Sequence, residues 1–188
     1  MPGVEPTGTV LFVCTANQCR SPMAEALLRQ RLGAGSAISV TSAGFLEEGY
    51  PCPTEVLEVM DQVGLDLSGH RSRQLDAEIV SQSSLIVTMG RQHLIDLVVR
   101  YPDAWQRAFT VSELLHRAGA AGGRTPDETL EDWATRLSWG RQRSDLLKLR
   151  SGADVADPMG KSIREFRDTR DRLMDFADRL FMQVVHSS

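Results

Sequence analysis

Residues 9–22 read TVLFVCTANQCRSP, and this stretch decides the fold class of the 188-residue chain. Residues 9–13 are apolar or β-branched, which predicts a buried strand. A helical pattern begins at Pro22, which suits a first helical turn because its missing N–H is not needed there. We expect Ser21 to be the N-cap of this helix. The stretch is therefore predicted to form a strand, a loop and a helix.

Further short apolar segments recur along the chain and are typical of buried strands. They lie at residues 38–40, 85–89 and 109–111. Amphipathic segments alternate with them and predict helices. These are a helix that begins at Pro53 and is closed by Gly64, one that carries residues 94–98, and a long one over residues 163–184. Such alternation is typical of a parallel sheet that is covered by helices on both faces.

Active sites in parallel sheets lie beyond the carboxyl ends of the strands. The loop that starts at Cys14, the segment around Ser42 and the segment after Met89 each follow a predicted strand. We therefore expect these three segments to meet at one edge of the sheet.

The composition is that of an ordinary globular protein, with 41% hydrophobic and 24% charged residues. At this length we expect a single domain over residues 1–188. The net charge is −4, and acidic and basic residues are interspersed along the chain, so no overall electrostatic field would attract nucleic acid. No apolar run is long enough for a membrane span, and residues 1–9 lack a secretory signal, so a cytoplasmic location is expected.

The chain has three cysteines, and this small and odd number does not suit a disulfide framework. A reducing compartment fits this count, and Cys52 is expected to be a buried free cysteine.

Residues 116–150 look like an insertion, with a glycine-rich start and a helix that contains Trp133 and Leu137. This segment also carries several basic residues, which are expected to form a solvated helical face. Contact with an acidic phosphoprotein is the alternative. The residues are Arg136, Arg141, Arg143 and Arg150.

Cys14 and Arg20 flank five residues, so a thiol and a guanidinium lie at opposite ends of one short loop. Backbone N–H groups of such a loop and the start of the following helix form an anion site the size of a phosphate. Arg20 can bind two oxygens of that anion at once. The loop residues between the two are Thr15, Ala16, Asn17, Gln18 and Cys19.

The positive field of this loop would stabilise a thiolate at Cys14, which can attack phosphorus directly. Ser21 is placed to donate a hydrogen bond to the sulfur. The chemistry then needs an acid for the leaving group, and Asp157, followed by Pro158 and set among apolar residues, is the candidate. A plain Asp-Pro turn is the alternative. No metal and no cofactor is required.

Four segments in order resemble the low-molecular-weight protein tyrosine phosphatases: VCTANQCRSPMAE at residues 13–25, SAG at 42–44, SGHRSR at 68–73, and LIVTM at 85–89 with His93. The resemblance implies a three-layer α/β sandwich, with a four-stranded parallel sheet flanked by helices and a phosphate-binding loop after the first strand. It implies that Cys14 is the nucleophile, Arg20 the phosphate ligand and Asp157 the general acid and then base.

The resemblance also implies a supporting hydrogen-bond network, formed by Asn17, Ser21, Ser42 and His70. Cys19 matches the second loop cysteine of the family, which can trap an oxidised nucleophile as a reversible disulfide.

Three positions depart from the family pattern. Ala16 replaces the usual glycine, which is harmless if its φ stays negative. Gln18 replaces the apolar residue of many tyrosine phosphatases and the threonine of arginine phosphatases. Met159 replaces an aromatic residue after Asp-Pro, which leaves Phe45 or Tyr50 as candidates for an aromatic wall.

These features predict a phosphatase that acts on a phosphorylated protein or a small phosphomonoester and releases phosphate. The choice between phosphotyrosine and phosphoarginine stays open. Arsenate reduction is one alternative, but its electron relay needs a further cysteine pair, and Cys52 stands alone outside the loop. A module that binds phosphorylated ligands without turnover is the other alternative, and it has no need of a reactive thiolate.

Overall fold

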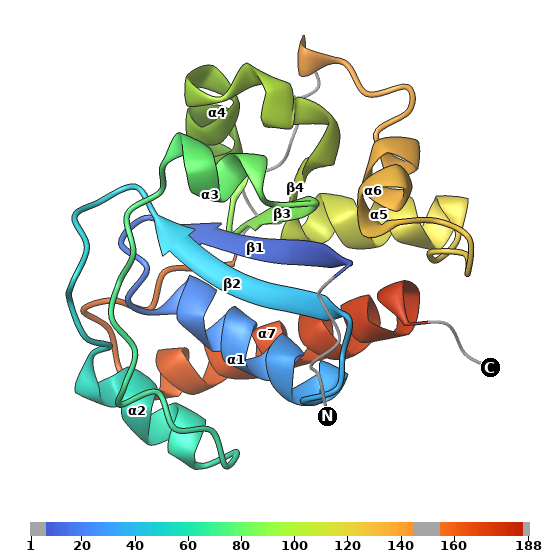
Figure 1. Ribbon diagram of the computed structural model, residues 1–188. Helices are drawn as coiled ribbons and strands as arrows, with labels where there is room; N and C mark the ends of the chain where they lie inside the picture. Colours follow the sequence, from blue (N-terminus) through green and yellow to red (C-terminus); the bar gives the residue numbers. More distant parts are fainter. Residues whose placement is uncertain (1–6, 145–154, 186–188) are drawn as a thin grey trace.

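The computed structural model describes residues 7–144 and 155–185. Its centre is a parallel sheet of four strands in the order β2-β1-β3-β4 (Figure 1). The strands are β1 Gly8–Cys14, β2 Ile38–Gly44, β3 Leu85–Thr88 and β4 Ala108–Thr110. The predicted α/β sandwich with a four-stranded parallel sheet is confirmed, and β2 extends further than expected, through the TSAG segment.

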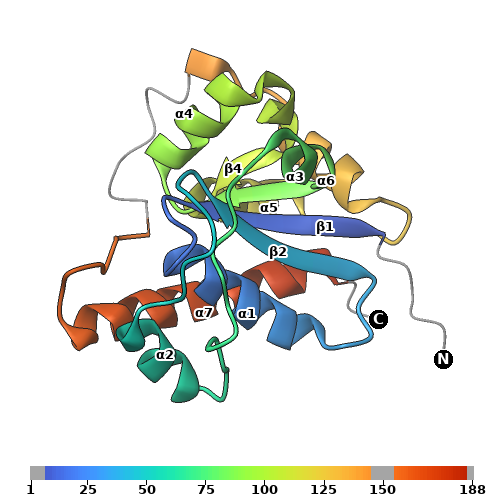
Figure 2. The same ribbon diagram turned by 60° about the vertical axis from the view of Figure 1, so that its left-hand side comes forward.

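Helices cover both faces of the sheet, as Figure 2 shows. On one face Val10 and Phe12 of β1 belong to a large apolar core, and on the other Leu11 and Val13 belong to a smaller one. The larger core includes residues of α1 Arg20–Leu32, α2 Thr54–Asp61, α5 Val111–Ala121, α6 Leu130–Leu137 and α7 Ile163–Val184. The smaller one includes residues of α3 Ala77–Ser81, α4 Arg91–Arg100 and the 3-10 helix η1 Pro102–Arg107.

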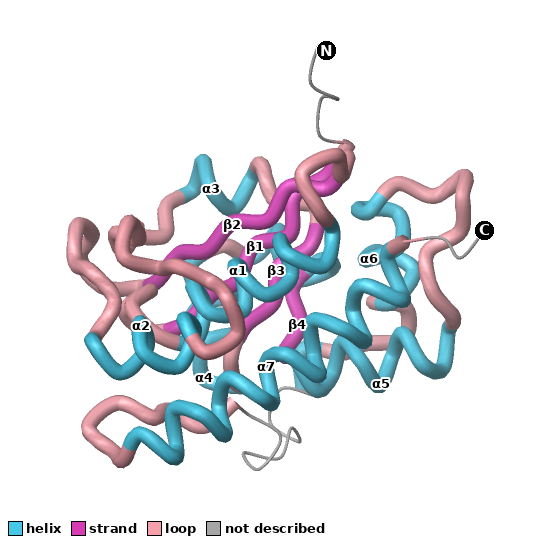
Figure 3. Tube along the Cα trace, turned by 90° about the horizontal axis from the view of Figure 1, so that it is seen from below, coloured by secondary structure: helices cyan, strands magenta, loops and turns pink. Residues whose placement is uncertain are grey.

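The long helix α7 packs across α1, with α5 beside it, in the layer nearest the viewer in Figure 3. Its predicted range of 163–184 is confirmed. Buried Phe166, Leu173, Phe176 and Leu180 recur at helical spacing and form the face that packs into the larger core, where Phe176 lies edge-on to Phe12 of β1.

The start of α1 differs from the prediction. The helix begins at Arg20 with Cys19 in the N-cap position, so Ser21 is not the cap. Its hydroxyl lies against Cys14 and Asn17 instead. Pro22 does lie in the first turn, as expected. A capping preference is a local property, and here contacts within the loop outweigh it.

The predicted helix around Trp133 and Leu137 is confirmed as α6. This helix begins with a capping box between Thr129 and Asp132. Trp133 is fully buried and donates from Nε1 to the carbonyl of Gly122. The segment after α5 is thus anchored to the main core.

The prediction that the basic residues of this segment form a solvated face is wrong for Arg141, whose side chain is 1% exposed. Its guanidinium pairs with Glu113 at 2.8 Å and lies over the rings of Trp105 and Phe109. A planar cation can satisfy a carboxylate and two aromatic faces together. Arg136 is also paired, with Glu128, whereas Arg143 is exposed and Arg150 lies outside the described residues.

Within residues 7–144 and 155–185, no helix has the length and apolar character needed to cross a membrane.

Candidate active site

The cysteine loop, residues 14–20, connects the end of β1 to the start of α1. Cys14 is 3% exposed, and its Sγ lies 3.0 Å from Ser21 Oγ. The pocket at this loop is lined by Cys14, Thr15, Ala16, Gln18, Cys19, Arg20, Asp157 and Met159. The structure therefore brings the predicted thiol, guanidinium and acid to one opening.

Asn17 holds the loop from inside. It is fully buried and has a φ of 52°, the one positive value at a non-glycine residue among those described. Its Nδ2 donates to Ser21 Oγ at 2.9 Å and to Ser42 Oγ at 2.7 Å, and its Oδ1 accepts from the backbone N–H of Arg73 at 2.8 Å. His70 Nε2 donates to the Asn17 carbonyl at 2.7 Å. The predicted grouping of Asn17, Ser21, Ser42 and His70 is thus seen in space.

These contacts orient the Ser21 hydroxyl. Because its oxygen accepts a hydrogen bond from Asn17, its hydrogen is directed elsewhere. Cys14 Sγ at 3.0 Å is the nearer partner, and the carbonyl of Ala43 at 3.5 Å is the weaker one. The serine is therefore set to donate to the sulfur.

Glu25 extends the network and was not singled out from the sequence. Ser42 Oγ donates to its Oε2 at 2.5 Å, and Arg29 Nη2 pairs with its Oε1 at 2.5 Å. The sequence did contain a signal, since Glu25 and Arg29 are four residues apart on one helix and can pair.

Glycine is required at position 44 because the backbone at the end of β2 lies very close to the backbone of the cysteine loop. A Cβ atom at this position would lie 2.6 Å from the backbone nitrogen of Asn17 and 2.9 Å from the carbonyl oxygen of Thr15. That carbonyl also accepts hydrogen bonds from the N–H groups of Phe45 and Leu46. The end of β2 therefore supports the cysteine loop directly. Ala16, by contrast, has no positive φ, so the missing glycine there causes no strain.

Arg20 connects the loop to the segment that carries Asp157. Its side chain is 8% exposed, and it donates to the Val155 carbonyl at 3.2 Å and to Asp157 Oδ2 at 2.5 Å. The backbone N–H of Val155 in turn donates to the carbonyl of Met89, just past β3. The cysteine loop, the segment that carries Asp157 and the end of β3 thus meet at one edge of the sheet. Since Asn17 of the loop also contacts Ser42, the three segments expected at this edge are found there.

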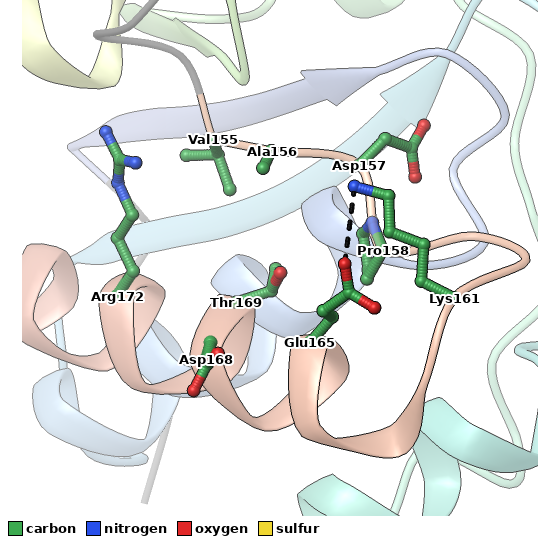
Figure 4. Close-up of a pocket in the computed structure, with 9 residues that line it drawn as sticks. All are labelled: Val155, Ala156, Asp157, Pro158, Lys161, Glu165, Asp168, Thr169 and Arg172. Atoms are coloured by element: carbon green, nitrogen blue, oxygen red, sulfur yellow. Dashed lines mark ion pairs between the residues drawn. The ribbon is translucent and has the colours of Figure 1, made fainter.

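A second pocket of about 190 Å³ lies beside the Asp157 segment and is lined by residues of that segment and of α7 (Figure 4). Lys161 and Glu165 form an ion pair at 3.7 Å in its lining. Acidic and basic side chains are mixed there, so this pocket lacks the basic character of an anion site.

His93 is a site residue to which the sequence assigned no role. It lies on α4, and its Nε2 is 2.9 Å from Thr15 Oγ1 in the cysteine loop. Its ring stacks on Phe45, with centroids 6.2 Å apart and planes 10° apart. Burial, and to a lesser extent the nearby charge of Arg20, lower the pKa of His93 to about 4.

The other two cysteines are buried and free. Burial raises the pKa of Cys52 to about 12, and it raises the pKa of Cys19 as well. The expectation that Cys52 is a buried free cysteine is confirmed.

Neither candidate for an aromatic wall lines the pocket at the loop. The Phe45 ring packs against His93 and lies 5.0 Å from the guanidinium of Arg100, and Tyr50 is 50% exposed. Met159 lies at the opening and is 45% exposed.

In the described part of the chain, no group of histidine, cysteine or acidic residues is placed to hold a metal ion.

Comparison with known proteins identifies several relatives. A probable low molecular weight protein-tyrosine-phosphatase, EpsP of Ralstonia solanacearum, is 42% identical over 107 residues, which are 56% of this chain and 72% of that protein. An arsenate reductase of Staphylococcus aureus is 41% identical over 81 residues, which are 43% of this chain and 59% of that protein. The solved structure of the YwlE arginine phosphatase of Geobacillus stearothermophilus is 30% identical with a TM-score of 0.69, and the match covers 93% of this chain and 90% of that one.

The family model described as low molecular weight phosphotyrosine protein phosphatase matches residues 9–127. This range begins in β1 and includes the cysteine loop, Ser42, His70 and His93. The parallel sheet and the cysteine loop after β1 agree with this match, and together they confirm the resemblance found in the sequence. The chain belongs to the low molecular weight phosphotyrosine protein phosphatase family.

Proposed function

We propose that this protein is a phosphatase that forms a cysteinyl-phosphate intermediate on Cys14. The observation that carries the proposal is the arrangement at the cysteine loop. Cys14 Sγ has a serine donor at 3.0 Å, and the guanidinium of Arg20 and the carboxylate of Asp157 lie at the same pocket. A thiol, a cation for phosphate and an acid are the groups that this chemistry needs.

In the first step the Cys14 thiolate attacks phosphorus while Arg20 and the N–H groups of the loop hold the phosphoryl oxygens. The bond from phosphorus to the leaving atom breaks, its electron pair stays on that atom, and Asp157 supplies the proton. Asp157 is 47% exposed in its side chain, so it can face an incoming substrate. Once phosphoryl oxygens bind Arg20, they replace the carboxylate as its partner, which frees the Asp157 side chain to face the leaving atom.

In the second step Asp157 takes a proton from water, and the water oxygen attacks the phosphorus of cysteinyl-phosphate. The S–P bond breaks and its electron pair returns to Cys14. The Ser21 hydroxyl, oriented by Asn17, stabilises the thiolate as it leaves. Phosphate is released, and the two steps use neither a metal nor a cofactor.

The proposed substrate is a phosphorylated protein in a reducing compartment such as the cytoplasm. The three free cysteines support that compartment. A tyrosine phosphatase and an arginine phosphatase are both among the relatives, and Gln18 and Met159 line the pocket where a substrate side chain would enter.

Turnover of phosphotyrosine and phosphoarginine peptides would decide between the two. The parent should be compared with Gln18→Thr and Gln18→Ile. If Gln18 governs selectivity, the ratio of the two kcat/KM values shifts in opposite directions in these variants. An unchanged ratio would remove Gln18 from the account of specificity.

Several relatives are arsenate reductases, but this chain has a single cysteine outside the cysteine loop and so lacks the cysteine pair that an electron relay needs. Cys52 lies between β2 and α2, is 6% exposed, and has a pKa raised to about 12, which keeps its thiol protonated at neutral pH. A thioredoxin-coupled arsenate assay should therefore show no turnover. Arsenate-dependent oxidation of thioredoxin, lost in Cys52→Ala, would establish this activity instead.

A further inference from the structure

His93 and Thr15 make a contact that the two steps above leave unexplained. His93 reaches the cysteine loop from α4, and its Nε2 lies 2.9 Å from Thr15 Oγ1. Thr15 directly follows Cys14 in the chain and lines the pocket at the loop. The contact therefore acts on a side chain next to the nucleophile.

The second nitrogen of His93 shows which atom carries the proton. Nδ1 is buried and has no hydrogen-bond partner among the residues that the structure describes. Buried N–H groups without an acceptor are rarer than acceptors without a donor, so the proton is placed on Nε2. Burial and the charge of Arg20, which lower the pKa of His93 to about 4, also keep the ring neutral.

This tautomer determines what the threonine does. A ring N–H at Nε2 donates to Thr15 Oγ1, and the hydroxyl hydrogen must then point to another acceptor. Because Thr15 lines the pocket, a phosphoryl oxygen bound there is such an acceptor. The stack of the His93 ring on Phe45 fixes the plane of the ring and so the direction of its N–H.

We propose that His93 is a positioning residue that donates from Nε2 to Thr15 Oγ1 and thereby turns the threonine hydroxyl into a hydrogen-bond donor for the bound phosphoryl group. This inference rests on the proposed function, since it assigns a further donor to the same site. It concerns binding of the phosphoryl oxygens and not proton transfer.

The first test reads the tautomer directly and needs no activity. Ring ¹⁵N shifts and couplings of His93 in the full chain, assigned by comparison with His93→Phe, should show a neutral ring protonated at Nε2. Protonation at Nδ1 would overturn the proposal, because Thr15 would then donate to the histidine and have no hydrogen for the substrate.

The second test uses variants that preserve packing. His93→Phe keeps a ring to stack on Phe45 and removes both nitrogens, and Thr15→Val keeps the shape of the side chain and removes the hydroxyl. Each should lower kcat/KM and the affinity for inorganic phosphate about tenfold, the size of one lost hydrogen bond to a charged group. His93→Gln, which can still donate to Thr15, should recover part of the loss.

The double variant separates positioning from a general structural role. If His93 acts through the hydroxyl, His93→Phe should cause no further loss in the Thr15→Val background. Equal losses in both backgrounds, or full activity and phosphate affinity in His93→Phe, would contradict the proposal. His116→Gln, an exposed histidine on α5, is the matched control and should match the parent. If the chain lacked phosphatase activity altogether, the tautomer and phosphate affinity would still decide this inference separately.

Discussion

Arg20 and Asp157 are 137 residues apart in the chain and form an ion pair with Nη2 and Oδ2 at 2.5 Å. The guanidinium that we propose as the phosphate ligand is thus bonded to the carboxylate that we propose as the acid. A phosphoryl group that binds Arg20 must compete with this carboxylate. The ion pair therefore links phosphate binding to release of Asp157 for proton transfer.

Asp157→Asn should have opposite effects on binding and on turnover. The amide competes less for Arg20, so affinity for inorganic phosphate should rise, whereas kcat for aryl phosphates with poor leaving groups should fall about 10²–10⁴-fold because the acid is lost. Steady-state kinetics with phosphate as a competitive inhibitor measures both. Asp168→Asn, at an exposed acid on α7, is the control and should behave as the parent. A variant with unchanged kcat would remove Asp157 from the mechanism.

Gly44→Ala should damage the loop without touching a reactive group. Its Cβ would lie 2.6 Å from the Asn17 nitrogen, so the backbone must shift, at a cost of about 1–3 kcal/mol in unfolding free energy. Misplacement of the loop should lower kcat/KM on the order of 100-fold. Gly69→Ala is the matched control, because a Cβ there meets nothing within 4 Å. Urea denaturation and kinetics on both variants test the claim, and equal behaviour would refute it.

Two substitutions of Asn17 should show how much its backbone conformation contributes to the stability of the protein. Asn17→Ala loses the side-chain contacts to Ser21, Ser42 and Arg73, and it also places an alanine at a φ of 52°. Asn17→Gly loses the same contacts without that strain. The glycine variant should therefore be more stable than the alanine variant by about 1 kcal/mol, measured by urea denaturation. If alanine were the more stable of the two, the loop would have to adopt another conformation.

Thiol reactivity should separate the three cysteines. Burial raises the pKa of Cys52 to about 12 from a usual value of 9.0, and it raises that of Cys19 too, so both stay protonated at pH 7. Brief treatment with iodoacetamide at pH 7, followed by peptide mass spectrometry, should label Cys14 first. Prior labelling of Cys52 would contradict the assignment.

The same burial predicts how stability depends on pH. Because the pKa of Cys52 is higher in the folded protein, its protonated thiol stabilises the fold below pH 9, and this contribution is lost as the pH rises from 9 toward 12. Urea midpoints across this range should therefore fall less steeply for Cys52→Ala. An equally steep fall in this variant would mean that other groups cause the alkaline loss.

The sheet was predictable from sequence because its strands are buried on both faces and read as continuous apolar runs, as residues 10–13 and 85–88 do. The loop after β1 was predictable because its residues are neighbours in the chain. Asp157 was predictable as a candidate, but its contact with Arg20 was not, since nothing local in the sequence indicates a partner 137 residues away.

The errors have a common origin. Ser21 has the residue type of an N-cap but makes its contacts with Cys14 and Asn17. Arg141 has the charge of a surface residue but lies between Glu113 and two aromatic rings. For Ser21 and Arg141, tertiary contacts outweigh the local preference of the residue. His93 was missed for a related reason, since its contact with Thr15 joins residues 78 positions apart in the chain.

The central claim is that phosphate is transferred to Cys14. In Asp157→Asn, hydrolysis of the intermediate should be slower than its formation from a substrate with a good leaving group. Acid quench of that mixture within the first turnover, followed by peptide mass spectrometry, should find one phosphoryl group on the sulfur of Cys14, and none should form with Cys14→Ser under the same conditions. A phosphoryl group on another residue, or steady turnover by Cys14→Ser, would contradict the account.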